Sequence, residues 1–366
     1  MKLKLNLSIC VVLMLVSSGC GSSNNSSSSG STGGGGTGGG GTAVTNVYLS
    51  GYTTSATTGK GVATYWKNGT ANSLTDGTVN SAAYAITVSG SDVYTAGMML
   101  SATTANTVAT YWKNDVATNL TDGTKDAEAV AIAVSGSDVY VAGFTISDAG
   151  YKVATYWKNG VATNLTDGTS YSDAHTIAVS GSDVYVAGTT MSKTTSSYIA
   201  TYWKNGTATT LTDGTQIAEA LAIAVSGSDV YAAGVTTSAS TRRNVATSWK
   251  NGLTINLTDG TTDSKALSIA VSGSNVYTAG FVSDATYGTP IATYWKNGVV
   301  TNLTDGTKYA NAEAIAVSGS DVYVTGLTTS ATTGNPVATY WKNGVATNLT
   351  DGSSYAVAFA IYIASE

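Results

Sequence analysis

The chain is poor in the residues on which most catalytic and metal sites depend. Its 366 residues include two cysteines, Cys10 and Cys20, and a single histidine, His175. These counts exclude a disulfide framework, a cysteine-based zinc cluster, a multi-histidine metal site and a Cys–His dyad. We therefore expect no cofactor and no bound metal.

Charge and proline are scarce as well. Only 11% of the residues are charged, and 17 lysines and arginines face 22 aspartates and glutamates, which gives a formal net charge of −5. Two prolines stand against 42 glycines. This composition is typical of strands joined by tight turns, and an acidic chain so poor in arginine is a poor candidate for binding nucleic acid.

Residues 1–19 have the features of a secretory signal. Lys2 and Lys4 precede an apolar run that ends at residue 16 and is too short to cross a bilayer. The run leads into Ser17-Ser18-Gly19-Cys20, which resembles the bacterial lipobox, although Ser17 replaces the usual leucine. The resemblance implies a lipid on Cys20, and Gly21 after it implies sorting to the outer membrane. The alternative is ordinary secretory cleavage, with Cys20 incidental.

Residues 20–46 consist mainly of serine, glycine, asparagine and threonine. Such a segment buries too little apolar surface to fold and is expected to be a flexible tether with a span of roughly 25–30 Å. The tether would hold a folded domain, residues 47–366, away from the membrane. We expect a lipid-anchored protein of the bacterial cell envelope, in the outer membrane.

The rest of the chain is one unit repeated seven times. The tryptophans are separated by 46 residues, except for one separation of 45. They are Trp66, Trp112, Trp157, Trp203, Trp249, Trp295 and Trp341. A period of 40–50 residues with strand-like content is the signature of β-propeller blades.

Each unit contains four expected strands. In one unit they cover residues 132–134, 139–142, 153–157 and 161–165, which we call strands A, B, C and D. Strands C and D are joined by Asn159-Gly160, a strong signal for a two-residue hairpin with positive φ at both positions. Six units carry Asn-Gly, and the seventh has Asn114-Asp115.

The two ends of the repeat region complete each other. Residues 47–51 match strand B without a preceding strand A, and residues 360–363 match strand A with nothing after it. We therefore predict an all-β, seven-bladed β-propeller with four antiparallel strands per blade. The C-terminal innermost strand would close the ring on three N-terminal strands and remove two exposed sheet edges. A closed ring of this kind is expected to be a monomer.

The pattern Ile-Ala-Val followed by Asp-Val-Tyr-Val-Ala resembles an NHL-type propeller blade, with strand A innermost. The near-identical units YWKNG and NLTDG resemble the highly repetitive propeller lipoproteins of bacteria. The resemblance covers residues 47–366. It implies the architecture and no particular activity, because one fold serves many functions.

Comparison of the seven units separates constant turns from variable loops. The A–B and C–D turns hardly vary, whereas the B–C and D–A loops do, and both variable loops should lie on one face of the disc. Two aligned columns at the start of strand A should surround the mouth of the central channel. The binding face that we predict from these columns and loops comprises Tyr84, Glu128, Asp173, His175, Glu219, Arg242, Arg243, Lys265, Glu313 and Phe359.

Three repeated or isolated features have simpler explanations than a ligand site. The Asp of each Leu-Thr-Asp-Gly turn could suggest calcium, but its side chain is better explained by a bond to its own backbone. The tryptophans could stack on sugars, but a fixed place on strand C favours a core between blades. His175 with Asp173 or Glu128 could be a general acid–base group, although a lone histidine is usually a bystander.

The function favoured by the sequence is a non-catalytic binding or interaction module. In this hypothesis the variable face would contact a glycan or a protein, and the chain would not be an enzyme. A passive structural or adhesion-related envelope protein is the first alternative. The second is a carbohydrate-active hydrolase or lyase that uses Glu128, Asp173, Glu219 or Glu313, since such chemistry needs paired carboxylates.

Overall fold

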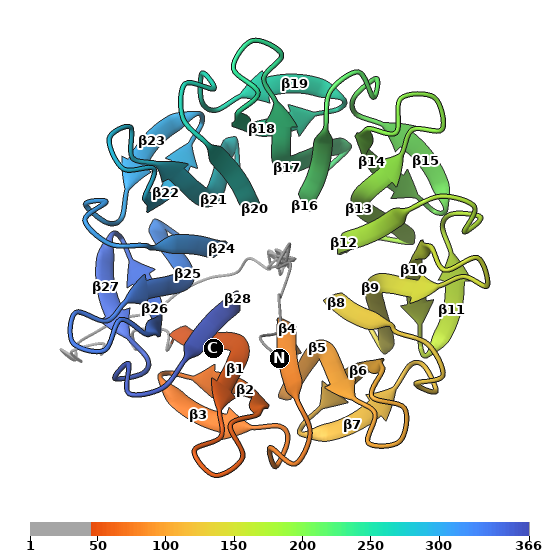
Figure 1. The fold of residues 1–366 in the computed structure, drawn as a ribbon, viewed down its shortest axis with the longest axis vertical. Helices are drawn as coiled ribbons and strands as arrows, with labels where there is room; N and C mark the ends of the chain where they lie inside the picture. The colour runs from red at the N-terminus through yellow and green to blue at the C-terminus, as the bar shows by residue number, and fades with distance from the viewer. Residues whose placement is uncertain (1–44, 366) are drawn as a thin grey trace, which may run out of the picture.

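A computed structural model describes residues 45–365. The predicted signal peptide, the lipidated Cys20 and the tether up to residue 44 lie outside these residues. The described chain forms 28 strands in seven four-stranded antiparallel sheets. The sheets are arranged as blades around a central axis, which confirms the predicted all-β, seven-bladed propeller (Figure 1).

The strands of each blade occupy four positions from the axis outward (Figure 1). The innermost strands, at position A, are β4 (Ser81–Ser89), β8 (Glu128–Ser135), β12 (Ser172–Ser180), β16 (Ala218–Ser226), β20 (Ser264–Ser272), β24 (Asn311–Ser318) and β28 (Ala356–Ser365). Position B holds β1 (Thr45–Thr54), β5 (Asp92–Leu100), β9 (Asp138–Ile146), β13 (Asp183–Met191), β17 (Asp229–Thr237), β21 (Asn275–Ser283) and β25 (Asp321–Thr329). Position C holds β2 (Gly61–Lys67), β6 (Thr107–Lys113), β10 (Lys152–Lys158), β14 (Tyr198–Lys204), β18 (Asn244–Lys250), β22 (Pro290–Lys296) and β26 (Pro336–Lys342). The outer position D holds β3 (Thr70–Ser73), β7 (Val116–Asn119), β11 (Val161–Asn164), β15 (Thr207–Thr210), β19 (Leu253–Asn256), β23 (Val299–Asn302) and β27 (Val345–Asn348).

The ring closes through the two ends of the described chain, as predicted. β28 pairs antiparallel with β1, from Thr45 opposite Ser365 to Thr53 opposite Ala356. This sheet therefore combines one C-terminal strand with three N-terminal strands, in the order β28-β1-β2-β3. Its register is the same as in the other six blades, so closure leaves no innermost strand unpaired.

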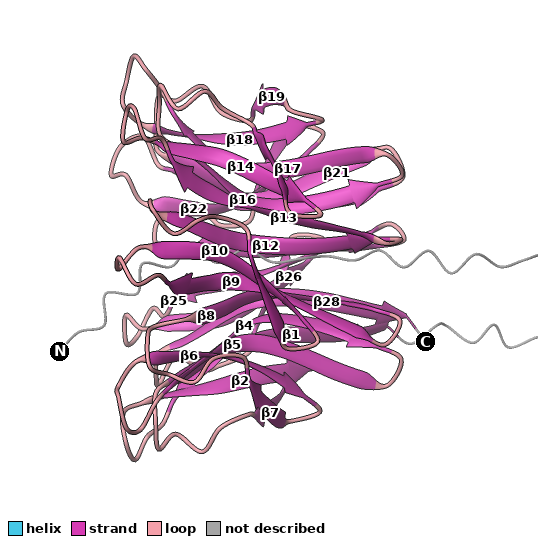
Figure 2. Cartoon of the chain, turned by 90° about the vertical axis from the view of Figure 1, so that its right-hand side faces the viewer, coloured by secondary structure: helices cyan, strands magenta, loops and turns pink. Residues whose placement is uncertain are grey.

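The tight turns have the conformations that the sequence predicts. Asn68 and Gly69 have φ values of 50° and 82°, and Asn114 and Asp115 have values of 46° and 70°. Two successive positive φ values define the hairpin turn that matches the twist of the strands. The longer B–C and D–A loops lie together on the opposite face of the disc, as Figure 2 shows edge-on. For example, the Thr58 hydroxyl of a B–C loop donates to the Gly77 carbonyl of the following D–A loop.

A side-chain network that the sequence analysis did not anticipate fastens the tight-turn face. In one blade, Asp138 accepts hydrogen bonds from the Asn159 amide and the Tyr140 hydroxyl, and its second oxygen lies 2.8 Å from Lys158 Nζ. The Lys158 ammonium also lies over the Tyr140 ring. The network explains the repeated Asp-Val-Tyr and Trp-Lys-Asn sequences as links between the A–B and C–D turns. In two blades Asn46 or Asn275 takes the place of the aspartate and still accepts from the turn asparagine.

The tryptophans form the core between blades, as predicted. All seven are buried. Trp112 packs on Ala63 of the preceding blade, together with Ala83 and Leu74. Contacts of this kind bury apolar side chains at the interfaces between neighbouring sheets.

Candidate acid–base site

A β-bulge in every innermost strand positions the candidate site. The register between positions A and B shifts by one residue in each blade, which leaves residues such as Tyr84, His175 and Glu313 without a partner on the neighbouring strand. Opposite each bulge lies a glycine, where an added Cβ atom would stand 1.9–2.0 Å from a backbone carbonyl oxygen. The repeated glycine of strand B is therefore required by close backbone approach.

This arrangement corrects the expected placement of the two columns. The innermost strands begin about four residues earlier than predicted, for example at Glu128 instead of Ile132. The column residues therefore belong to the innermost strands or directly precede them, and most of them are buried. Tyr84, Asp173, His175, Glu313 and Phe359 are buried, and Glu128, Glu219 and Lys265 are half-buried.

Arg242 and Arg243 lie apart from this group. Both are exposed in the loop between β17 and β18, and Arg243 pairs with Asp263 at 3.4 Å. The ten predicted residues therefore divide into an inner group on the innermost strands and two exposed arginines on the loop face.

Asp173 is the centre of the best-connected polar cluster. Its Oδ2 atom lies 2.8 Å from Lys152 Nζ of the preceding blade and accepts a hydrogen bond from the Tyr171 hydroxyl at 3.3 Å. The Lys152 ammonium also lies 3.5 Å from the centre of the Phe144 ring. The other oxygen, Oδ1, is buried without a hydrogen-bond partner among the described residues. A buried carboxylate oxygen in this state can accept a hydrogen bond from a water molecule or a ligand.

His175 is oriented by the next blade. Its Nδ1 atom lies 3.1 Å from the Ala220 carbonyl oxygen on β16. A carbonyl oxygen can only accept, so Nδ1 carries the hydrogen of this bond. The opposite ring nitrogen, Nε2, lies 4.0 Å from Asp173 Oδ2. This separation exceeds a direct hydrogen bond. Because Nδ1 carries the hydrogen, the lone pair of the neutral ring is on Nε2.

Glu128 lies near Asp173, and the pKa of the Glu128 carboxyl group is raised. Burial raises its pKa to about 7, and the charges of Asp173 and Asp126 act in the same direction while Lys152 opposes them. A carboxyl group with this pKa is partly protonated at neutral pH, so it can donate a proton. On the other side of Asp173, Glu219 and Lys265 approach each other to 3.9 Å, beyond hydrogen-bond reach.

Glu313 is a separate buried acid on β24. It accepts a hydrogen bond from the Asn311 amide at 2.8 Å, and burial raises its pKa to about 7. The neighbouring positions on β28 and β4 are apolar, and Phe359 contacts Tyr84 edge-on with ring centroids 5.8 Å apart. We call Tyr84 on β4 and Phe359 on β28 the aromatic arc. From β8 to β24, by contrast, each innermost strand carries at least one charged or titratable side chain at or near its bulge.

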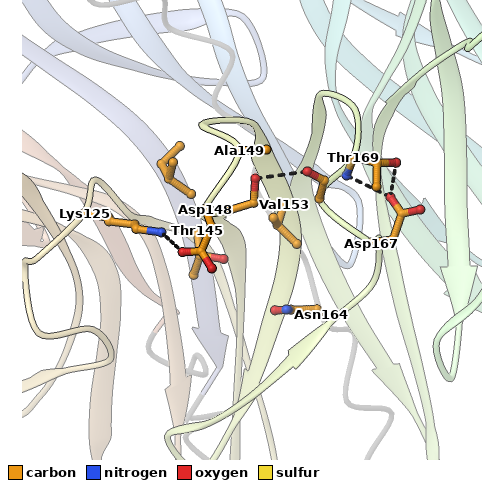
Figure 3. Close-up of a pocket in the computed structure, with 11 residues that line it drawn as sticks. Lys125, Thr145, Asp148, Ala149, Val153, Asn164, Asp167 and Thr169 are labelled. Carbon is orange, nitrogen blue, oxygen red and sulfur yellow. Dashed lines mark hydrogen bonds and ion pairs between the residues drawn. The ribbon is translucent and has the colours of Figure 1, made fainter.

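A shallow groove of about 460 Å³ lies on the loop face of the third blade (Figure 3). The loop between β9 and β10, which lines the groove, spans residues 147–151 and is one residue shorter than its counterparts. Lys125 reaches across to Asp148 at 2.6 Å, and Asp167 accepts from Thr169. These side chains satisfy one another, so the groove gathers no free acid–base groups.

The Asp of each Leu-Thr-Asp-Gly turn behaves as the sequence predicts. Asp76, for example, accepts from the backbone N–H and the hydroxyl of Thr78. Within residues 45–365, no group of three or more His, Cys, Asp or Glu side chains is arranged to hold a metal ion. The same part of the chain contains no helix long and apolar enough to cross a membrane.

Two residues outside the predicted binding face hold the cluster together. Lys152 and Tyr171 come from the variable loops of the sequence, and both contact Asp173. The signal that could have revealed them is the glycine in the middle of every strand B, because glycine inside a strand marks a bulge or a close backbone approach. A bulge would have extended the innermost strands into the variable columns.

Comparison with known proteins gives matches at the level of structure only. No family model and no curated protein sequence matches the chain. A puromycin-hydrolysing peptidase of Mycobacterium tuberculosis is similar with a TM-score of 0.56 at 9% identity, over 82% of this chain and 53% of that one. The β-propeller domain of the Trilobed protease from Pyrococcus furiosus, described as having an open velcro topology, has a TM-score of 0.53 at 11% identity, over 84% and 95% of the two chains. The acylaminoacyl peptidase of Pyrococcus horikoshii has a TM-score of 0.52 at 14% identity, over 84% and 51%.

These likenesses establish the propeller fold, and they correct the functional expectation. The chain spans about half the length of two of the three similar proteins. Two of them are named as peptidases, and the third is the β-propeller domain of a protease. The prediction of a non-catalytic binding module is corrected on this finding, because the fold is shared with proteins that are named as peptidases.

Proposed function

We propose that the protein is a hydrolase whose acid–base groups are Glu128, Asp173 and His175 at the inner ends of β8 and β12. The observation that carries this proposal is the buried Asp173 Oδ1, which has no hydrogen-bond partner among the described residues. The other oxygen of the same carboxyl group lies 4.0 Å from His175 Nε2, and Glu128, whose pKa is about 7, is close enough to be affected by the Asp173 charge. Perturbed titratable groups gathered in one place are typical of catalytic sites.

The arrangement supplies the two proton transfers that hydrolysis requires. A water molecule between His175 Nε2 and Asp173 would give its proton to Nε2 as its oxygen attacks the scissile carbonyl carbon. Protonated Glu128 would donate its proton to the leaving group as the bond to the carbonyl breaks. Asp173, paired with Lys152, would stabilise the imidazolium that forms. The proton on Nε2 then returns to Glu128, which restores both groups.

Peptides are the first substrate class to test. The similar solved structures are named as peptidases, and amide hydrolysis needs both a general base and a general acid. Their low identity leaves the choice of substrate to the experiment.

The test is a screen of the purified protein against a fluorogenic peptide-amide library, with chromogenic glycosides as a second panel. We expect turnover of amide substrates that falls by about a hundredfold or more in both Glu128→Gln and His175→Gln, because each removes one proton transfer. Arg242→Gln, an exposed change on the loop face, is the matched control and should retain full activity. Absence of turnover in both panels, or full activity in either active-site variant, would refute the proposal.

We also propose that Cys20 carries the lipid anchor and places the protein in the bacterial cell envelope, at the outer membrane. The support is the sequence Ser17-Ser18-Gly19-Cys20 followed by a Ser/Gly-rich segment. The wild-type protein should partition into detergent and gain the mass of a lipid, whereas Cys20→Ser should not. Cys10→Ser is the control, and equal partitioning of all three proteins into water would contradict the proposal.

A further inference from the structure

The loop face above β24 and β28 carries tyrosines that the acid–base site does not use. Tyr309 and Tyr355 precede the bulge residues of successive blades by four positions, and they are 48% and 44% exposed. Tyr52 on β1 stacks on Tyr355 with ring centroids 5.8 Å apart and an interplanar angle of 16°. We call Tyr52, Tyr309 and Tyr355 the tyrosine platform.

Hydrogen bonds to the backbone and contacts between rings hold the platform in place. The Thr329 hydroxyl donates to the Tyr309 carbonyl at 2.7 Å, and the Thr54 hydroxyl donates to the Tyr355 carbonyl at 3.3 Å. Tyr52 also contacts Phe359 of the buried aromatic arc, with centroids 5.8 Å apart. The backbone is thus held at Tyr309 and Tyr355, and ring contacts hold Tyr52 and Tyr355, so binding on these two rings would cost little conformational entropy.

Asn311 and Glu313 follow Tyr309 at the start of β24 and bring buried oxygen acceptors close to the platform. The Asn311 amide nitrogen donates to Glu313, but its oxygen Oδ1 is buried and has no partner among the described residues. No positively charged side chain among the described residues pairs with Glu313. The hydrogen bond from the Asn311 amide is what favours its ionised form. Burial raises the pKa of Tyr309, and the charges of Glu313 and Tyr355 raise it further. Glu313 therefore acts electrostatically on the platform.

We propose that the tyrosine platform binds an organic cation, namely an ammonium group bearing small apolar substituents. The face of an aromatic ring is electrostatically negative and attracts such a cation within about 6 Å of its centroid. The nearby Glu313 carboxyl group and Asn311 Oδ1 add negative potential without a competing lysine or arginine contact. An anion would be repelled, and a neutral apolar group would leave the charge of Glu313 uncompensated.

Choline and its neutral carbon isostere, in which a tert-butyl group replaces the trimethylammonium group, are the probes. Both would be titrated calorimetrically into the purified protein at about pH 8, where Glu313 is largely ionised. We expect choline to bind at least about fivefold more tightly than the isostere, and Tyr355→Ala and Glu313→Gln each to weaken choline binding about fivefold to tenfold.

Two control variants separate this site from other effects. Tyr287→Ala, which removes an exposed tyrosine from the loop between β21 and β22, should leave choline binding unchanged. Glu128→Gln should also leave it unchanged, although it removes the proposed hydrolysis, so the two proposals fail independently. No binding of choline, equal binding of the isostere, or unchanged binding in both Tyr355→Ala and Glu313→Gln would overturn the inference.

Discussion

The buried carboxyl group of Glu313 should make the stability of the propeller depend on pH. Its pKa is raised from 4.5 to about 7, mainly by burial. An unfolded chain ionises Glu313 more readily than the folded one does, so folding favours the protonated form. The contribution to stability is therefore fully present below about pH 4.5 and is lost as the pH rises through about 7.

The size of the effect follows from the shift. At roughly 1.36 kcal/mol for each pH unit, the difference between the two pKa values corresponds to about 3 kcal/mol at about pH 8. Glu313→Gln keeps the shape and can still accept from Asn311, but it cannot ionise. The variant should therefore be more stable than the wild type by up to about 3 kcal/mol at about pH 8, with little of this difference at about pH 4.5.

Urea unfolding of both proteins between about pH 4.5 and pH 8 measures this difference. Asp148→Asn, which removes an exposed ion-pair partner of Lys125, is the control and should leave the stability nearly unchanged over the same pH range. A stability difference between Glu313→Gln and the wild type that does not grow with pH would refute the reasoning, because it would mean that Glu313 titrates alike in both states.

Three further predictions concern the architecture. Gly97→Ala should lower the free energy of unfolding by more than about 3 kcal/mol, because the new Cβ would stand 1.9 Å from a backbone oxygen, whereas Gly59→Ala, at φ +68° in open space, should lower it by only about 1 kcal/mol. Equal losses of stability in urea unfolding would contradict the role of the bulge. Asp138→Asn should leave the midpoint of urea unfolding nearly unchanged, since another blade already uses Asn275 at this position, and a large fall in that midpoint would show that the Lys158 contact is essential. Deletion of residues 356–365 should expose the edge of β1 and cause aggregation or unfolding, so a soluble, monomeric product with unchanged thermal unfolding would argue against closure by β28.

The fold could be predicted because its determinants are local and repeated. Asn159-Gly160 specifies a hairpin by itself, and the spacing of the tryptophans specifies the number of blades. The closing pair of β1 and β28 followed from the missing strand at each end of the repeat. Each of these inferences needed only the order of residues along one unit.

The candidate site could not be predicted to the same extent, because its contacts join different blades. The sequence separates Lys152 from Asp173, and His175 from Ala220, by 21 and 45 residues. Their proximity depends on the bulge, which extends the innermost strands and turns columns expected at the surface into buried positions. Glu128 and His175 were named as candidates, but their burial and the perturbed pKa of Glu128 follow from packing that no single unit reveals.

The bulge column also indicates where this repetitive chain departs from its own template. Seven blades share one backbone and one register, yet the residue at the bulge is aliphatic or aromatic in five blades and is a histidine or a glutamate in two, at His175 and Glu313. An apolar residue at this place packs between blades at no electrostatic cost, whereas a buried carboxyl group must lose its hydration or its charge. Since the apolar alternative is present in the neighbouring blades, with Leu267 next to Glu313, stability alone does not account for the two polar choices. We infer that these two blades are the places to test for chemistry, one for proton transfer and the other for cation binding.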